Sequence, residues 1–170
     1  MSFARPRPDD ARGTVTTGFG YDCHPFASGR RLVLGGVELS HDRGLAGHSD
    51  ADVLTHAIID ALLGAAALGD IGQHFPDSDE RYQDADSLEL LRTTVAMLTH
   101  RGMSILHVDA TVVIERPHVA PVREDIRLSL AEALGISVEH VNVKATRGEG
   151  MGFVGREEGA VAMAIATVER

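Results

Sequence analysis

The sequence is poor in cysteine and in aromatic residues. Its 170 residues include one cysteine, Cys23, no tryptophan, two tyrosines and five phenylalanines. A single cysteine excludes an intrachain disulfide, so nothing requires an oxidising compartment, and we expect Cys23 to be a small buried residue. The length fits one domain, and 44% apolar with 24% charged residues is typical of globular proteins. We therefore expect one folded domain, located in the cytoplasm.

Basic residues and long apolar runs are also scarce. Sixteen lysines and arginines stand against 25 acidic residues, which gives a formal net charge of −9. Such a surface argues against nonspecific binding to nucleic acid or to anionic membranes, and a phosphorylated substrate would need metal ions or well-placed basic groups. The richest apolar run, residues 57–68, is interrupted by Asp60 and Gly64 and is too short to cross a bilayer. The sequence therefore predicts neither a nucleic-acid partner nor a membrane partner.

The periodicity of the apolar residues predicts an α/β domain over residues 14–170, after a flexible tail over residues 1–13 that lacks an apolar signal core. The Ser49-x-x-Asp52 pair is typical of the start of a helix. Helices are predicted at 49–68, 87–101 and 121–134, strands at 14–22, 31–39, 107–115, 141–145 and 160–167, and loops at 70–83 and 146–159. Two adjacent glycines, Gly35 and Gly36, interrupt the strand at 31–39 and indicate a bulge or a hairpin there.

The last predicted strand alternates large and small side chains. Val161, Met163, Ile165 and Thr167 share one face, and the alanines between them share the other. Alanine by itself favours helix, but the two-residue period favours a strand. The small face indicates the close approach of another layer or of a second subunit.

One aspartate and two histidines could form a metal site. Asp22 and His24 are two residues apart at the end of a strand, so their side chains point the same way. His56 stands in a row with Asp52 and Asp60 on the first helix, and a carboxylate is a partner that fixes the tautomer of a metal-bound imidazole. The three ligands would leave a fourth position open, as in catalytic Zn²⁺ sites. Solvated histidines are the alternative, because this spacing alone is weakly specific.

Two segments around the first helix could contact an anionic ligand. His48 and Ser49 precede the helix, whose amide groups and dipole favour an anion, although Ser49 could simply cap the helix. The loop at 70–83 carries acidic residues that could accept hydroxyl groups of a polyol, but an acidic surface loop is equally expected there.

The glycine-rich segment 146–153 could hold phosphate. Its glycines allow backbone amides to approach a phosphate, Arg147 adds a planar donor group, and Glu149 could bind a hard cation. A flexible loop without a ligand is the alternative. Nearby, Arg156 and Glu158 could form no more than a surface ion pair.

Four segments, in this order, carry a family resemblance: GFGYDCHPF, GLAGHSDADVLTHAIIDALLGAAALGDIGQHFPDSD, ADSLELLR, and VNVKAT followed by GF-x-GR-x-EG. They resemble the 2-C-methyl-D-erythritol 2,4-cyclodiphosphate synthase family of the non-mevalonate isoprenoid pathway, from about Gly18 to the C-terminus. The resemblance implies a homotrimer of small α/β subunits, each with a mixed sheet on one side and helices on the other. It places active sites between neighbouring subunits and implies that an isoprenoid diphosphate can bind on the trimer axis, near Arg156 and Glu158.

The resemblance also implies the reaction. The substrate would be 4-diphosphocytidyl-2-C-methyl-D-erythritol 2-phosphate, whose 2-phosphate attacks the β-phosphate to form the cyclic diphosphate and release CMP. By the same resemblance, Asp22, His24 and His56 bind Zn²⁺, Glu149 binds Mg²⁺ or Mn²⁺, and His48 stabilises the transition state. The other implied substrate-side residues are Ser49, Asp70, Ile71, Gly72, Phe75, Pro76, Asp77, Ser78 and Asp79 around the methylerythritol part, Ile114, Pro117, His118, Val119, Ala120, Thr146, Arg147 and Gly148 around the cytidine diphosphate, and Phe153 and Arg156.

The chain departs from the family pattern beside the phosphates. Arg147 and Gly148 stand where the family has threonines, His118 stands in place of a lysine, and Val122 in place of a histidine. Loss of the lysine lowers the attraction for phosphate, which Arg147 could restore from the opposite loop. Two alternatives therefore stay open: a relative that acts on a different nucleotide-activated phosphate, and a non-catalytic trimer that binds a diphosphate.

Overall fold

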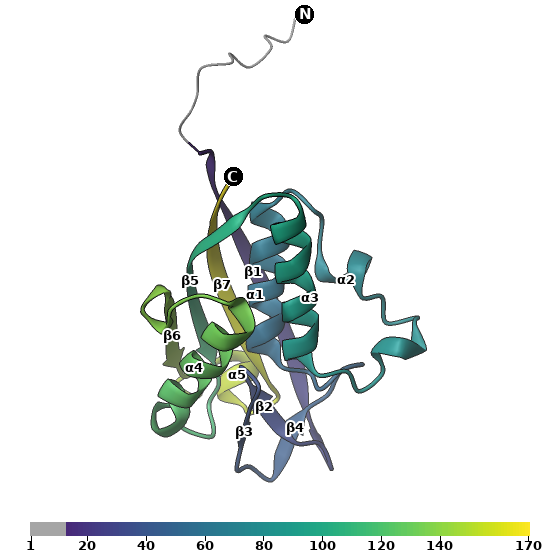
Figure 1. The fold of residues 1–170 in the computed structure, drawn as a ribbon. Coiled ribbons are helices and arrows are strands. Elements are labelled where there is room, and N and C mark those ends of the chain that lie inside the picture. The colour runs from purple at the N-terminus through teal and green to yellow at the C-terminus, as the bar shows by residue number, and fades with distance from the viewer. Residues whose placement is uncertain (1–12) are drawn as a thin grey trace, which may run out of the picture.

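A mixed five-stranded sheet forms one layer of the fold and helices form the other (Figure 1). The computed structural model describes residues 13–170, so residues 1–12 of the predicted tail lie outside the described part of the chain. The strands of the sheet are β1 (Val15–Ser28), β4 (Arg43–Leu45), β5 (Ser104–Val113), β6 (Val141–Thr146) and β7 (Gly159–Glu169). Their order is β4-β1-β7-β5-β6, and β5 pairs with β6 in parallel while the other pairs are antiparallel.

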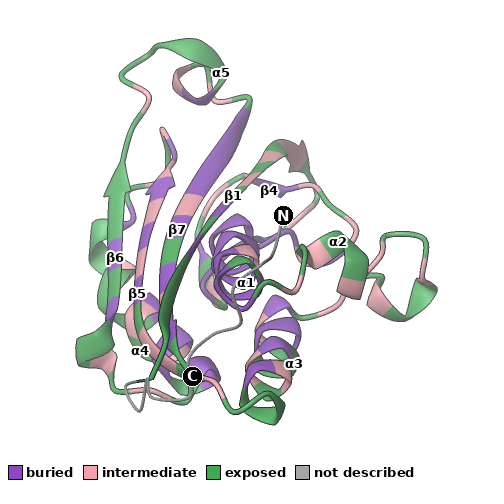
Figure 2. Ribbon diagram, turned by 90° about the horizontal axis from the view of Figure 1, so that it is seen from above, coloured by how far each residue is buried: buried purple, intermediate pink, exposed green. Residues whose placement is uncertain are grey.

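The helices pack in a layer on one face of this sheet (Figure 2). Helices α1 (Val53–Ala65) and α4 (Arg123–Leu134) lie against the strands, and α3 (Ser87–His100) packs against both helices. Shorter elements are the helices α2 (Ile71–His74) and α5 (Gly152–Gly155) and the 3₁₀ turns Glu80–Tyr82, Ala120–Val122 and Val138–His140. Across residues 13–170, the structure contains no helix with the length and apolar character needed to span a membrane.

The predicted elements are present, with several corrections at their ends. Strand β1 continues beyond Asp22 to Ser28. The segment 31–39 is a hairpin of β2 (Leu32–Leu34) and β3 (Val37–Leu39) that turns at Gly35 and Gly36, which is one of the two forms expected from that interruption. Strand β4 was not predicted, and the predicted loops contain α2 and α5. The first helix begins at Val53 because Asp52, and not Ser49, is its N-cap: the Asp52 carboxylate accepts a hydrogen bond from Thr55 N at 3.0 Å.

Small residues bring α1 very close to strands β1 and β7. The alanines between residues 160 and 166 of β7 are buried, and Gly18 and Gly20 lie opposite two of them on β1. A Cβ atom on Gly18 would lie 2.1 Å from the carbonyl oxygen of Ala61, and one on Gly20 would lie 1.9 Å from that of Ala57. The small face of β7 therefore packs against a helix of the same subunit. Of the two expected partners of this face, another layer or a second subunit, the structure shows the first.

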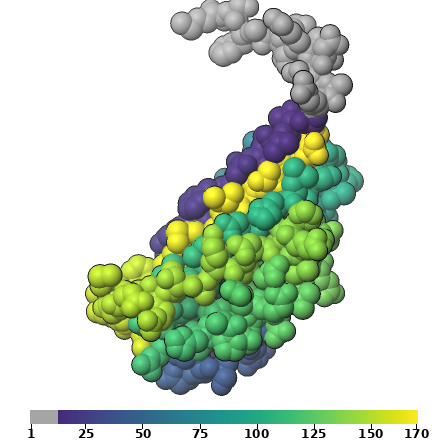
Figure 3. Space-filling view, turned by 90° about the vertical axis from the view of Figure 1, so that its left-hand side faces the viewer, coloured from purple at the N-terminus to yellow at the C-terminus, as the bar shows by residue number. Residues whose placement is uncertain are grey.

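The opposite face of the sheet exposes apolar side chains. Phe19 and Ile165 are partners in the β1–β7 ladder, and they are 63% and 45% exposed. Tyr21 is exposed beside them, and so is Cys23, which corrects the expected buried position of that cysteine. In Figure 3, β1, β7 and β5 lie side by side at the surface as purple, yellow and teal stripes. We call the set Phe19, Tyr21 and Ile165 the apolar sheet face; contiguous apolar surface of this kind indicates an interaction site.

Replacing Gly20 with alanine tests the close approach of α1. We expect Gly20→Ala to lower the free energy of unfolding by about 1–3 kcal/mol or more, because the added methyl group meets backbone atoms that cannot move independently. In Gly64→Ala, the matched control within α1, the new Cβ meets no atom nearer than 3.8 Å. The control should gain up to about 1 kcal/mol, because alanine favours helix. Denaturant unfolding measures both, and a Gly20→Ala variant as stable as the parent would contradict the packing described here.

Candidate functional site

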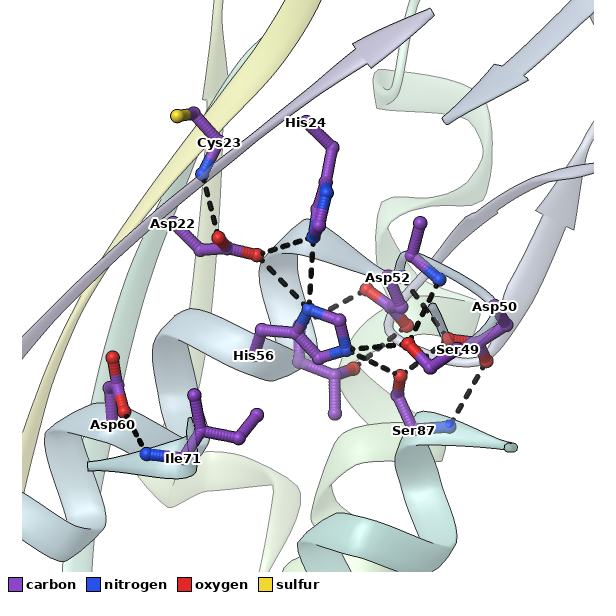
Figure 4. A network of polar contacts seen from close by, with 12 residues as sticks. Asp22, Cys23, His24, Ser49, Asp50, Asp52, His56, Asp60, Ile71 and Ser87 are labelled. Carbon is purple, nitrogen blue, oxygen red and sulfur yellow. Dashed lines mark hydrogen bonds and ion pairs between the residues drawn. The ribbon is translucent and has the colours of Figure 1, made fainter. Parts of the chain in front are cut away.

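Asp22, His24 and His56 converge at the junction of β1 and α1, as the sequence predicts (Figure 4). Nδ1 of His56 lies 3.0 Å from Oδ2 of Asp22 and 3.2 Å from Nε2 of His24, and the last two atoms are 3.0 Å apart. Tetrahedral Zn²⁺ with bonds of about 2.0–2.2 Å keeps its ligand atoms about 3.3–3.6 Å from one another. One carboxylate and two imidazoles at these separations therefore fit a metal ion with only small adjustments.

The charges of these three side chains favour a bound cation. Burial opposes ionisation of Asp22, but hydrogen bonds and charge from His24 and His56 hold the pKa of this carboxyl well below its usual range. Burial also disfavours a charged His56, yet the hydrogen bond and charge of Asp22 outweigh it and raise the pKa of the imidazole. Asp22 is thus an ionised carboxylate within a largely enclosed site. Its negative charge, which attracts the proton of His56, would attract a bound metal ion in the same way.

The row of Asp52, His56 and Asp60 is not a solvated polar face. Asp52 is fully buried, and its carboxylate accepts hydrogen bonds from the first turn of α1 and from Gly36 N at 2.8 Å, with none to the imidazole of His56. Burial raises the pKa of Asp52 and that of Asp60. The expectation that a carboxylate of this row orients the imidazole is therefore wrong for Asp52, whose acceptor atoms serve the helix cap and the β2–β3 turn.

Two serines contact the outer nitrogen of His56 instead. Nε2 of His56 lies 2.8 Å from Oγ of Ser87 and 3.2 Å from Oγ of Ser49, and both serines are buried. Ser49 thus turns its hydroxyl toward the ligand histidine. Ser87 was missed by sequence reasoning because it is 31 residues from His56 and carries no motif beyond following the N-cap of α3.

A pocket of about 260 Å³ adjoins the metal triad. The predicted residues that line it are Asp22, His24, His48, Ser49, His56, Ile71, Gly72, Phe75 and Asp77. The pocket lining excludes four predicted residues of the 70–83 segment: Asp70, Pro76, Ser78 and Asp79. Asp70 caps α2, and Asp79 pairs with Arg81, which explains where those two carboxylates point. His48 lies in the loop before α1, not at the helix end, with Nε2 3.3 Å from the carbonyl oxygen of Asp79.

A second pocket of about 270 Å³ contains most of the residues expected around a nucleotide. Its predicted lining residues are Ile114, Pro117, His118, Val119, Ala120, Thr146, Arg147 and Glu149. Arg147 Nη2 lies 3.2 Å from the Glu149 carboxylate, so one cation and one anion of the glycine-rich segment already face each other. Gly148 contributes its amide to Glu115 at 2.9 Å and lies outside the pocket lining.

The two pockets lie on different sides of the subunit. Figures 1 and 2 both place α2, which borders the first pocket, and β6, which leads into the second, at opposite sides of the molecule. Phe153 and Arg156 line neither pocket, and Arg156 forms an ion pair with Glu158 at 2.8 Å. One subunit therefore does not join all the predicted site residues into a single cavity.

The fold and the triad define a small α/β domain in which one carboxylate and two imidazoles are placed to fit a metal ion. Comparison with known families identifies it more closely. The chain belongs to the YgbB family, whose profile matches residues 15–169.

Two similar relatives are named as synthases. The chain is 57% identical over 152 residues to a 2-C-methyl-D-erythritol 2,4-cyclodiphosphate synthase from Salinibacter ruber, which covers 89% of this chain and 97% of that relative. A synthase of the same name from Syntrophomonas wolfei is 56% identical over 92% of this chain and 99% of its own length. Among solved structures, the CDP complex of IspF from Plasmodium falciparum superposes with a TM-score of 0.81 at 26% identity, covering 94% of this chain and 98% of the other.

Replacing His56 with alanine tests the metal triad. We expect His56→Ala to lose the bound metal almost completely, because two remaining ligands hold a divalent ion far less tightly than three. Metal analysis of the purified protein after dialysis measures this. His100→Ala, which removes an exposed histidine at the end of α3, is the control and should retain its metal. Full metal content in His56→Ala would refute its assignment as a ligand.

Proposed function

We infer that this chain converts 4-diphosphocytidyl-2-C-methyl-D-erythritol 2-phosphate into 2-C-methyl-D-erythritol 2,4-cyclodiphosphate with release of CMP. The enzyme is a lyase of non-mevalonate isoprenoid biosynthesis, and we expect it to act in the cytoplasm. The observation that carries this conclusion is an identity of more than 50% to synthases of that name over about nine tenths of the chain. The CDP complex of the Plasmodium falciparum relative supports a substrate that carries cytidine diphosphate.

We assign Zn²⁺ to the Asp22, His24 and His56 triad. Nitrogen and carboxylate ligands with an open fourth position are typical of catalytic zinc, which would polarise a phosphoryl oxygen as a Lewis acid. Glu149, assigned to Mg²⁺ or Mn²⁺, offers a single carboxylate. Ions of this kind are commonly held by one or two carboxylates together with substrate phosphates, so one protein ligand is compatible with the assignment.

The residues of the chain position and stabilise charge, and none needs to act as a general base. A phosphate monoester has a second pKa of about 6, so the attacking 2-phosphate is already anionic at neutral pH. His48 borders the first pocket beside the triad and is placed to stabilise charge that develops on the phosphoryl group. Ile71, Gly72, Phe75 and Asp77 enclose the pocket from the 70–83 segment, and exclusion of water there would favour cyclisation over hydrolysis.

We propose that the complete active site forms between subunits of a homotrimer. The first pocket holds the metal triad and the second holds Arg147 and Glu149, and they open on different sides of one subunit. The apolar sheet face supplies surface for assembly, and association of that face would bring the first pocket of one subunit to the second pocket of its neighbour. Phe153 and Arg156 are assigned to the substrate side in that arrangement, and an isoprenoid diphosphate is the expected ligand on the axis near Arg156 and Glu158.

Turnover of the authentic substrate tests the function. Purified protein with Zn²⁺ and Mg²⁺ should release CMP and form the cyclic diphosphate in equal amounts, which phosphorus NMR resolves. CMP with a linear product would make the enzyme a hydrolase. Absence of turnover by protein with bound metal would favour a different nucleotide-activated substrate, or a diphosphate-binding role without catalysis.

Replacing Arg147 with threonine, the residue type of the family pattern, tests whether its cation serves the substrate. We expect Arg147→Thr to raise KM about 10–150-fold, because a hydrogen bond to a charged phosphate contributes about 1.5–3 kcal/mol. Metal content at the triad should not change. The control is Arg92→Thr, which removes an arginine of α3 that pairs with Glu89 away from both pockets. Steady-state kinetics measures both, and unchanged kinetics in Arg147→Thr would show that the departure from the family pattern has no role in binding.

A further inference from the structure

The outer nitrogen of His56 begins a chain of hydrogen bonds that the metal triad does not include (Figure 4). Nε2 of His56 lies 2.8 Å from Oγ of Ser87, the first residue of α3. The Ser87 hydroxyl donates a short hydrogen bond to Oδ1 of Asp50, and Oδ2 of Asp50 accepts the backbone N–H of Ser87 at 3.0 Å. Ser87 is fully buried and His56 nearly so, while Asp50 is half-buried. The chain thus runs from the metal site to a carboxylate on its far side.

The direction of these bonds fixes the proton on His56. An ionised carboxylate only accepts hydrogen bonds, so the single hydroxyl proton of Ser87 points to Asp50. The oxygen of Ser87 can then only accept from His56, which places the imidazole proton on Nε2. Ser49 Oγ, at 3.2 Å, is a second acceptor for the same N–H and receives the backbone N–H of Ala51. With Nε2 protonated, Nδ1 is the nitrogen that faces Asp22 and His24 and is available as the metal ligand.

We propose that Ser87 and Asp50 are positioning residues that hold His56 in the metal-binding tautomer and orientation. The inference rests on the metal site of the proposed function. A metal-bound imidazole needs an acceptor for its second N–H, and the Ser87 hydroxyl supplies it while the charge of Asp50 polarises that hydroxyl. Asp52, the carboxylate four residues before His56, is engaged in capping α1 and does not contact the imidazole.

The chain also ties the metal site to the segment that encloses the first pocket. Between that segment and α3, Asp84 and Ala85 are held to the loop before α1 by two backbone bonds. Asp84 N donates to the carbonyl oxygen of His48 at 2.8 Å, and Asp50 N donates to that of Ala85 at 3.1 Å. Asp50 therefore contacts both Ala85, which follows this segment, and Ser87, the partner of His56.

Metal affinity of the whole protein tests the proposal without reference to substrate. We expect Ser87→Ala to weaken binding of Zn²⁺ and Co²⁺ about 10–100-fold in competition with a chelator, the range seen when outer partners of ligand histidines are removed. Absorption of the Co²⁺-loaded protein should also change, because a reoriented imidazole alters the ligand field. Ser87→Thr retains the hydroxyl and should restore most of the affinity and the parent spectrum.

Two matched controls separate this role from a structural one. Thr94→Val removes another buried hydroxyl from α3, one that donates to Leu90 O at 2.9 Å and does not contact His56. Asp50→Asn removes the charge at the end of the chain, and Asp86→Asn is its control, because Asp86 also accepts a backbone N–H of the first turn of α3. We expect weaker metal binding in Asp50→Asn and parent affinity in Thr94→Val and Asp86→Asn, whatever their thermal stability. The Ser87→Ala/Asp50→Asn double variant should bind metal no more weakly than Ser87→Ala, because Asp50 acts through the Ser87 hydroxyl.

The outcomes that overturn the proposal are distinct from failure of the proposed function. Parent-like affinity and Co²⁺ absorption in folded Ser87→Ala overturn it, as does an equal loss in the control variants. If Ser87→Ala fails to fold, Asp50→Asn decides: weaker binding than Asp86→Asn supports the proposal, and equal binding overturns it. A parent protein that binds neither ion overturns both the metal assignment and this inference. A parent that binds metal but fails to turn over the substrate contradicts the proposed reaction alone.

Discussion

The separation between α1 and the two central strands is the constraint on which the metal site depends. Gly20 permits the backbone of β1 to approach Ala57, the residue after His56, so closely that a Cβ atom would lie 1.9 Å from its carbonyl oxygen. Asp22 is two residues further along the same face of the strand. Any side chain at Gly20 would push the helix outward and widen a triangle of ligand atoms whose sides are now 3.0–3.2 Å.

The close packing of α1 on β1 matters chemically because it holds the charge of Asp22 beside two imidazoles. The pKa of Asp22 is held well below its usual range, so an ionised, partly buried carboxylate lies beside two imidazoles. A chain with a net charge of −9 has no general attraction for a phosphorylated substrate. The proposed metal ions, together with Arg147 in the second pocket, are therefore the groups that would compensate the charge of two phosphates brought together for cyclisation.

The two faces of the central sheet differ in composition and in role. The inward face of β1 and β7 carries glycine and alanine and accepts α1, whereas the outward face carries Phe19, Tyr21 and Ile165. Because the first pocket and the pocket that contains Glu149 lie on different sides of the subunit, the proposed reaction needs a second copy to complete the site. In the proposed assembly the apolar sheet face would supply that contact, and β1, the strand that carries Asp22 and His24, also carries Phe19 and Tyr21 of this face.

Local pattern in the sequence determined most elements and suggested Asp22, His24 and His56 as a candidate triad, because apolar period, caps and the Asp-x-His spacing act over a few residues. The resemblance to a family determined the reaction. Tertiary structure alone decided which acceptor His56 finds: the carboxylate at helical spacing, Asp52, is used by the helix cap, and Ser87 arrives from another helix. The tertiary structure also decided that Cys23 lies on the exposed face of the sheet and that the predicted ligand residues divide between two pockets. Contacts between distant segments depend on how layers pack, and no short-range spacing encodes that.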